Sequence, residues 1–172
     1  MGIRKVILAV AILGFSVNAS AQKMSHDRSP GDIYVGYSLL NGDTFSTASG
    51  FELALTGNVN DWFALKADFS GNYKSEAGAH AHEFNVLFGP QVSVTGERLR
   101  LFAHGLLGIA HFNADPGPSD TSGGWVLGGG ADYPLNNQFA WRVAQLDYHG
   151  ARIFGATQKD FRFSTGILFL FR

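Results

Sequence analysis

From residue 31 onward the sequence repeats one pattern, an alternating apolar and polar segment followed by a polar break, and we count eight such segments. Successive side chains of a β-strand point to opposite faces, so this alternation indicates strands with one apolar face. A strand that crosses a membrane needs about 9–11 residues with an apolar side chain at every second position. The expected strands cover residues 32–40, 50–59, a segment from 62, 82–93, 98–112, 124–133, a segment from 139, and 160–172.

The charged residues of these segments fall in one phase and the bulky apolar residues in the other. In the last segment, Phe161 and Phe163 share a phase that excludes Arg162. A Lys or Arg that faces the middle of a bilayer costs about 2–4 kcal/mol, so a lipid-facing phase avoids charge. The phenylalanines would overfill a narrow lumen, and small residues such as Ala54 and Ser164 accompany the charges. We therefore predict that the charged phase faces the interior and forms a structural ion network of Glu52, Lys66, Asp68, Glu83, Arg100, Asp132, Arg142 and Arg162.

This set of four acids and four bases is nearly neutral. An eight-stranded barrel has an interior just wide enough for side chains to fill, and buried charges without partners are too costly to persist. We expect a plugged barrel rather than an open channel, with mutual pairing within Glu52, Glu83, Arg100 and Arg142. A soluble lipocalin-like carrier would show the same separation of faces, but with its charged face outside.

The breaks between segments alternate in length. Long polar connections are expected at 41–49, 71–81, 113–123 and 150–159, and tight ones at 60–61, 94–97 and 134–138. Outer-membrane barrels have short periplasmic turns and longer outer loops, so this alternation favours a membrane barrel. Two irregularities predict bulges. Pro90 lies inside the fourth strand, where it cannot donate to the ladder, and the seventh strand changes phase around residues 144–146.

The N-terminus has the three parts of a secretory signal peptide. A basic start at 1–5 is followed by an apolar, uncharged run at 6–15 and by Ala19-Ser20-Ala21, so we expect cleavage before Gln22. A membrane anchor is the alternative, but it needs about 20 apolar residues and this run has roughly half as many. The expected organisation is a signal peptide at 1–21, a short periplasmic segment at 22–30, and a β-barrel at 31–172.

Composition narrows the function further. The chain has no cysteine, which excludes a disulfide framework and a lipid on an N-terminal cysteine. Its formal net charge of -1 gives no field that would attract nucleic acid. With 22 Gly, 15 Phe and 16% charged residues, the composition suits strands better than helices.

The last three segments resemble a known family. The runs Gly128-Gly129-Gly130-Ala131-Asp132-Tyr133, Trp141-Arg142-Val143-Ala144-Gln145-Leu146-Asp147-Tyr148 and Phe161-Arg162-Phe163-Ser164-Thr165-Gly166 are similar to the outer-membrane β-barrel domain family related to the OmpA transmembrane domain. The resemblance covers about residues 31–172. It implies an eight-stranded, antiparallel up-and-down barrel with both termini in the periplasm. It also implies that Phe171, which Arg172 follows, is the aromatic signal that the barrel-assembly machinery reads, and it implies no reaction. Unlike OmpA itself, the sequence stops at the closing strand, so we expect no peptidoglycan-binding domain.

The histidines are the remaining candidates for chemistry. His80 and His82 share one face of a strand, but no third ligand lies at a telling spacing, so a metal site is not expected. His104 is interpreted as an interior hydrogen-bonding residue. His111 and His149 approach the outer rim, where barrel enzymes that trim lipid A carry a His–Ser–acid set. Neither is followed by a serine at the spacing of those enzymes.

Gly128-Gly129-Gly130 is not followed by Lys-Ser/Thr, so it is interpreted as close backbone packing and not as a phosphate loop. We expect no catalytic residue, no cofactor and no metal. The main hypothesis is a non-enzymatic outer-membrane protein, structural or surface-interacting, with outer-membrane lipid and the assembly machinery as partners. A narrow small-solute channel, a lipid A-modifying enzyme and a soluble carrier stay open as alternatives. The sequence does not identify an extracellular ligand.

Overall fold

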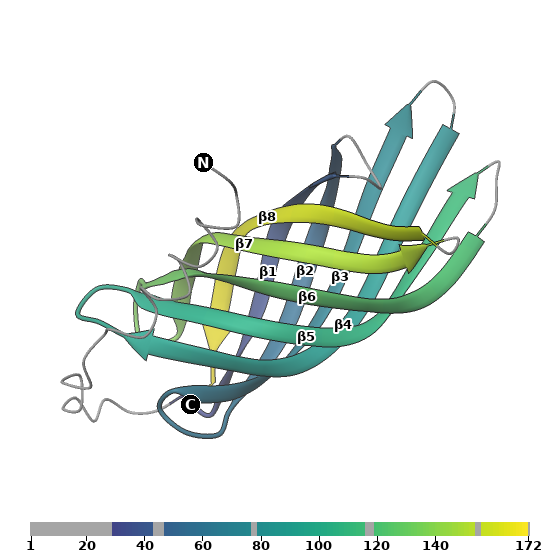
Figure 1. Cartoon of the computed structure of the whole chain (residues 1–172). Coiled ribbons are helices and arrows are strands. Elements are labelled where there is room, and N and C mark those ends of the chain that lie inside the picture. Colours follow the sequence, from purple (N-terminus) through teal and green to yellow (C-terminus); the bar gives the residue numbers. More distant parts are fainter. Residues whose placement is uncertain (1–28, 43–46, 77–78, 116–118, 154–155, 172) are drawn as a thin grey trace, which may run out of the picture.

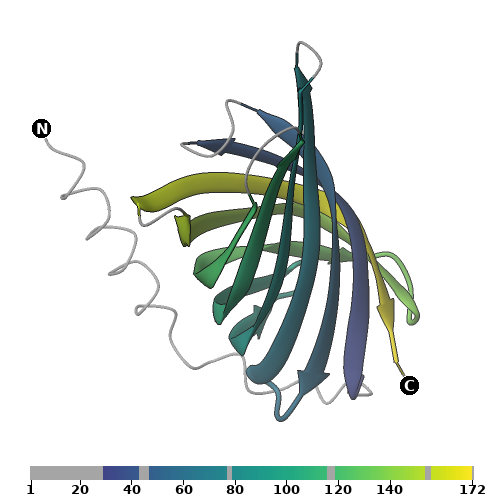
Figure 2. The same ribbon diagram turned by 90° about the vertical axis from the view of Figure 1, so that its right-hand side faces the viewer.

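The computed structural model describes residues 29–42, 47–76, 79–115, 119–153 and 156–171. These residues form eight antiparallel strands, which close into the barrel shown in Figures 1 and 2. Each strand pairs with the next, and β1 also pairs with β8, where Asp32 lies opposite Leu170. The predicted eight-stranded up-and-down barrel is therefore confirmed. The strands are β1 (Gly31–Gly42), β2 (Ala48–Asn58), β3 (Phe63–Glu76), β4 (Ala79–Thr95), β5 (Arg100–Asp115), β6 (Ser119–Pro134), β7 (Phe139–Ile153) and β8 (Ala156–Leu170).

Closure of the barrel satisfies the backbone. Because β1 and β8 pair with each other, each strand has a hydrogen-bonded neighbour on both sides, and the sheet has no open edge around its middle. No helix in the described part of the chain has the length and hydropathy needed to span a membrane. The residues of the predicted signal peptide, 1–21, and most of the 22–30 segment lie outside the described residues.

The two faces of the wall have opposite chemistry. Leu107 and Phe88 on the outer face are 71% and 57% exposed, whereas Lys66, Asp68 and Arg162 on the inner face are 0% exposed. The outward side chains of the middle of the wall are apolar and the inward ones include most of the buried charges. A water-soluble barrel would have its charged face outside and its apolar face inside. The alternative of a soluble lipocalin-like carrier is therefore wrong. An apolar belt over a closed sheet fits a hydrocarbon environment.

The two ends of the barrel differ. The end where β1 begins and β8 ends also carries the connections 59–62, 96–99 and 135–138, and we call it the turn end. The opposite end, with the connections 43–47, 77–78, 116–118 and 154–155, is the hairpin end. Near the turn end, Trp141 lies opposite Tyr133 on the neighbouring strand. Toward the hairpin end the rings of Trp125 and Tyr148 meet with centroids 5.5 Å apart. Aromatic residues thus occur near both borders of the apolar belt, as in membrane proteins.

The prediction of long loops at this end is wrong. Most of residues 71–81, 113–123 and 150–159 belong to strands, so the hairpin-end connections are as short as 77–78 and 154–155. Figure 1 shows the β3–β4 and β5–β6 hairpins continuing well beyond the rest of the barrel. Polarity misled the prediction because both faces of a strand meet water once it leaves the belt. The apolar alternation then ends although the backbone ladder continues. The asymmetry between the two ends is real, but it is one of strand length.

Of the two predicted bulges, one is present. The register of β7 shifts between Arg142 and Gln145 against β8, and that of β6 shifts between Ala131 and Asp132 against β7, which confirms the bulge in the seventh strand. The prediction of a bulge at Gly89–Pro90 is wrong. Phe88 pairs with Leu107 and Gln91 pairs with His104, so the ladder between β4 and β5 opens at residues 89–90 without a register shift. Proline removes a donor but does not by itself require an extra residue.

Leu107 provides a test of the outward belt, because it is 71% exposed near the middle of β5. We expect Leu107→Arg to reduce the free energy of unfolding from lipid vesicles by about 2–4 kcal/mol, the cost of a cation at the bilayer midplane. Urea titration followed by tryptophan fluorescence measures it. Val59→Arg, in a turn and 61% exposed, is the matched control and should cost about 1 kcal/mol or less. Equal effects of the two substitutions would contradict a lipid-facing position for Leu107.

Candidate functional site

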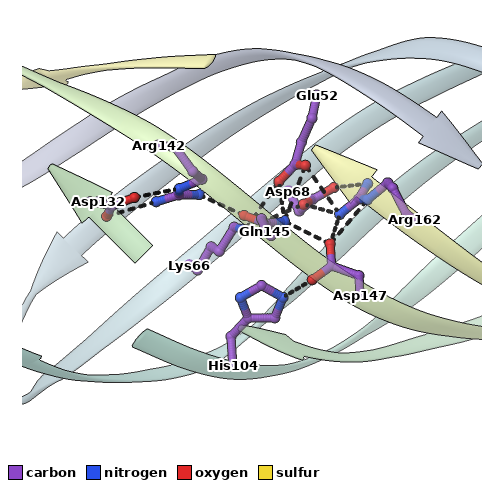
Figure 3. Close-up of polar contacts among 9 residues, drawn as sticks. All are labelled: Glu52, Lys66, Asp68, His104, Asp132, Arg142, Gln145, Asp147 and Arg162. Carbon is purple, nitrogen blue, oxygen red and sulfur yellow. Dashed lines mark hydrogen bonds and ion pairs between the residues drawn. The ribbon is translucent and has the colours of Figure 1, made fainter. Parts of the chain in front are cut away.

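The most unusual feature of the interior is a group of ions that has no access to water. We call Glu52, Lys66, Asp68, Asp147 and Arg162 the central cluster. Their side chains are 0% exposed. The strands bring them together by register, because Asp147 of β7 lies directly opposite Arg162 of β8, and the other three residues project from β2 and β3 across the lumen (Figure 3).

Arg162 is the hub of the central cluster. Its Nη2 lies 2.7 Å from Asp147 Oδ2 and 2.8 Å from Asp68 Oδ2. The same nitrogen lies 3.5 Å from Glu52 Oε2, and Nε donates a further hydrogen bond of 3.0 Å to Asp147. One guanidinium thus contacts three carboxylates. Its planar fork of five N–H donors suits it to this task better than the three donors of a lysine.

Lys66 and His104 complete the surroundings of these carboxylates. Lys66 Nζ lies 3.2 Å from Glu52 Oε1 and 3.5 Å from Asp68 Oδ2. His104 Nε2 lies 3.0 Å from Asp147 Oδ1, which agrees with the prediction that His104 is an interior residue. Buried carboxylates are tolerated when several charged donors reach them, and this arrangement supplies such donors.

A second group lies toward the turn end. We call Asp32, Arg100, Asp132 and Arg142 the turn-end cluster. Asp132 lies opposite both Arg100 on β5 and Arg142 on β7, so one carboxylate serves two arginines by cross-strand pairing. Arg100 Nη2 lies 2.9 Å from Asp132 and 3.1 Å from Asp32, and Arg142 Nε donates to Asp132 Oδ1 at 2.8 Å. Arg100 is the most exposed of the four, with 18% of its side chain accessible.

Aromatic rings hold Arg142 in position. Its guanidinium carbon lies 4.3 Å from the centroid of the Tyr34 ring and 4.2 Å from that of Phe102. Both distances are in the range of cation–π contacts. Phe102 needs space on β6, and Gly130 provides it, since a Cβ at that position would lie 2.8 Å from the Phe102 ring. In the same glycine run, a Cβ on Gly128 would collide with the carboxylate of Asp147. The glycines therefore admit the buried side chains of the neighbouring strands.

Gln145 joins the two clusters. Its Nε2 donates to Glu52 Oε1 at 2.8 Å and to Asp147 Oδ2 at 2.6 Å, and its Oε1 accepts from Arg142 Nη1 at 2.7 Å (Figure 3). Gln145 follows Arg142 by three positions, so a regular strand would place them on opposite faces. The β7 bulge brings both inside, and with them Asp147 and His149.

The structure places all eight residues of the predicted interior set on the inner side of the wall, but it does not bring together Glu52, Glu83, Arg100 and Arg142. Glu52 belongs to the central cluster and the two arginines to the turn-end cluster, whereas Glu83 lies outside both. The interior also contains acids that the predicted set omits. Three further acids are buried, namely Asp32, Asp147 and Asp160. The buried side chains of the described residues thus include seven carboxylates and three Lys or Arg side chains, and Arg100 is 18% exposed.

The other candidate residues form no centre of chemistry. The described residues contain no group of three or more His, Asp or Glu that is spaced to hold a metal ion. The side chain of His80 lies outside the described residues. His111 hydrogen-bonds Thr121 Oγ1 through Nδ1 at 2.7 Å, while His149 is buried inside the barrel and does not face the outer wall. The two histidines considered for a lipid-trimming site are therefore on opposite faces of the wall.

Comparison with known proteins supports the fold. A family model described as outer membrane protein beta-barrel domain matches residues 7–168. Among solved structures, Neisserial surface protein A (NspA) is similar with a TM-score of 0.62 and 12% identity, over 82% of this chain and 96% of that one. The attachment invasion locus protein Ail of Yersinia pestis has a TM-score of 0.56 and 19% identity, over 81% and 97%. The N-terminal β-barrel domain of Pseudomonas aeruginosa OprF has a TM-score of 0.51 and 16% identity, over 81% and 99%. No curated protein sequence matches the chain.

The hub role of Arg162 predicts a large loss of stability when its charge is removed. We expect Arg162→Gln to lower the free energy of unfolding by about 3–5 kcal/mol, because three carboxylates lose their shared cation in a site without water. Lys159→Gln, on the same strand but exposed, is the matched control and should change stability by about 0.5 kcal/mol or less. Denaturant unfolding in lipid or detergent measures both. Similar midpoints for the two variants would contradict the hub role.

Proposed function

The chain belongs to the outer membrane protein beta-barrel domain family, and on that premise we propose that it is a plugged, non-enzymatic barrel that displays its hairpin end outside the cell. Outer-membrane lipid surrounds the apolar belt. The two ion clusters plug the lumen, and the strand extensions of the hairpin end interact with external partners. The observation that carries this proposal is the combination of a filled lumen with strands that continue beyond the belt.

The plug is supported by the contents of the lumen from end to end. The turn-end cluster and the central cluster cross the lumen and are linked through Gln145. Three apolar groups fill the space around them. They are Tyr34, Ala54, Ala140 and Leu168; Leu87, Leu106 and Val126; and Leu40 and Ala48 with Phe112. An eight-stranded barrel has room for little more than these side chains. A solute path would require the ion pairs to separate, which buried pairs resist.

The orientation follows from the difference between the two ends. Outer-membrane barrels keep short turns in the periplasm and place their longer segments outside. The turn end carries the start of β1 and the end of β8. We therefore place both termini in the periplasm. In this position Phe171, which follows β8 and is 39% exposed, is available as the signal for the assembly machinery.

The surface for external partners is the sheet formed by the ends of β3, β4, β5 and β6. Pairing between β3 and β4 continues to residues 76 and 79, and pairing between β4 and β5 continues to residues 80 and 115. On the side of β7, the ladder of β6 ends at Gly124. Residues 119–123 of β6 thus have backbone groups that no described residue of β7 pairs, and such an edge accepts an added strand. By their names, Ail and NspA are an attachment protein and a surface protein, which is the role proposed here.

A plugged lumen predicts that the barrel does not conduct ions. In planar bilayers we expect the wild-type barrel to show no stepwise conductance. The double substitution Asp132→Ala with Arg142→Ala removes one acid and one base between Tyr34 and Phe102, and we expect it to open a water path and produce steps. A gel shift on heating verifies that both proteins are folded barrels. Regular steps from the wild type would support the narrow small-solute channel and contradict the plug.

The orientation can be tested with single cysteines, because the chain has none. In intact cells, a membrane-impermeant maleimide should label Thr121→Cys at the hairpin end and leave Gly96→Cys at the turn end unlabelled. Both positions are exposed, so they form a matched pair. After the outer membrane is permeabilised, both should react. Labelling of residue 96 but not 121 in intact cells would reverse the proposed orientation.

A further inference from the structure

The barrel wall divides near the hairpin end. β6 and β7 pair up to Gly124 and Ala151, beyond which β6 pairs with β5 and β7 pairs with β8. Figure 1 shows the two hairpins diverging at this point, which we call the fork. A small pocket lies at the base of the fork, lined by Glu83, Asn85, Leu87, Gly124, Trp125, His149, Gly150, Ala151 and Asp160. We call it the fork pocket.

Two buried polar atoms at the fork pocket have no hydrogen-bond partner among the described residues. They are Oε2 of Glu83, which is 3% exposed, and Nε2 of His149, which is 5% exposed. The other carboxylate oxygen of Glu83 accepts a hydrogen bond of 2.9 Å from Asn85 Nδ2. A buried acceptor without a partner destabilises the fold, and more so when it is charged. Such atoms around a pocket indicate a donor that fits inside it, either a water molecule or the N–H groups of a small cation.

The charge around the fork pocket favours a cation. The four bases of the central and turn-end clusters contact the acids of those clusters, and neither cluster includes Glu83. A second buried acid, Asp160, lines the same pocket. Two acids therefore line the pocket, and Glu83 is the one whose Oε2 has no hydrogen-bond partner among the described residues.

We propose that the fork pocket binds a small ammonium-type cation, the head of a primary amine, which enters from the side between β6 and β7. Its N–H groups donate to Glu83 Oε2 and His149 Nε2, which belong to residues that line the pocket. The space holds a group about the size of one water molecule, so a quaternary ammonium is excluded. A transition metal is disfavoured, because the described acids and histidines lack the spacing of a metal centre.

The competing occupant of Glu83 is a proton. A protonated carboxyl would also remove the buried charge, and it would leave the pocket without a ligand. The two alternatives can be told apart by titration. Only if the pocket accepts a cation will the added ligand bind with saturation and displace the carboxyl proton. Infrared spectroscopy detects the carboxyl proton, and calorimetry detects the ligand. Both measurements use the full barrel in detergent micelles.

The experiment is a calorimetric titration of the folded barrel with methylammonium chloride, with potassium chloride and tetramethylammonium chloride as controls of equal ionic strength. We expect saturable binding of methylammonium alone. Glu83→Gln should weaken it at least about tenfold, since loss of one partner of a buried charge pair has effects of this size or larger. The infrared band of a protonated carboxyl should decrease as methylammonium binds. Glu97→Gln, at an exposed turn position, controls for the change of charge.

A second pair of variants blocks the pocket without changing charge. A Cβ on Gly124 would make ordinary contacts with Ala110 and project at the lining of the pocket, whereas a Cβ on Gly123 would meet nothing within 4 Å. Gly124→Ala should therefore weaken methylammonium binding and Gly123→Ala should not, with both proteins folded by the heat-shift gel. No binding to the wild type, binding that Glu83→Gln or Gly124→Ala leaves unchanged, or equal binding of potassium would each overturn the proposal. Tighter binding of Zn²⁺ that requires Glu83 would overturn the ammonium class in favour of a metal.

Discussion

The interior of this barrel depends on one guanidinium. Arg162 contacts Glu52, Asp68 and Asp147 at distances from 2.7 to 3.5 Å, and all of these side chains are withdrawn from water. An ionised carboxylate in such a place costs several kcal/mol unless charged donors surround it. Arg162 and Lys66 together contact carboxylates from β2, β3 and β7. The cluster therefore fixes which inner faces oppose one another, in a barrel whose apolar groups alone are small and discontinuous.

The β7 bulge is what makes this arrangement possible. A regular strand would place Arg142 inside and then send Gln145, Asp147 and His149 to the lipid-facing side. The extra residue reverses the phase, so β7 contributes Arg142 to the turn-end cluster and Asp147 to the central cluster. Gln145 then spans the distance between them. One irregularity of backbone thus connects two ion groups that would otherwise be separate, as bulges commonly do where a side chain must be redirected.

Much of the fold is readable from the sequence, because the period of two is imposed by strand geometry and the charges show which phase is inside. The eight strands, the outward phase and the β7 bulge follow from this pattern. The exact partners do not. Asp147 and Gln145 face inward only after the bulge changes the phase, so they become detectable only when the predicted phase change is followed along the rest of the strand. The inward position of Asp32 was detectable, since Asp32 lies in the phase opposite to that of Ile33. Shear between strands decides which inward residues meet across the lumen, and for this reason Glu83 was assigned to a network that it does not enter. The strand extensions were missed because polar residues on both faces resemble a loop.

Strand pairing and inner-face contacts divide the barrel into a rigid part and a less constrained part. Around the belt, each strand has two hydrogen-bonded neighbours and its inner face contacts an ion cluster or an apolar group. Beyond the fork, β6 has only β5, and its inward side chains lie past the two ion clusters. Fewer buried contacts mean that local opening there costs less free energy than in the belt. Surface segments that engage partners are drawn from such regions. The fork lies at the border between the two regimes, where a strand ladder ends above a buried carboxylate, so a ligand held there would affect both the charge of the lumen and the spacing of the outer hairpins.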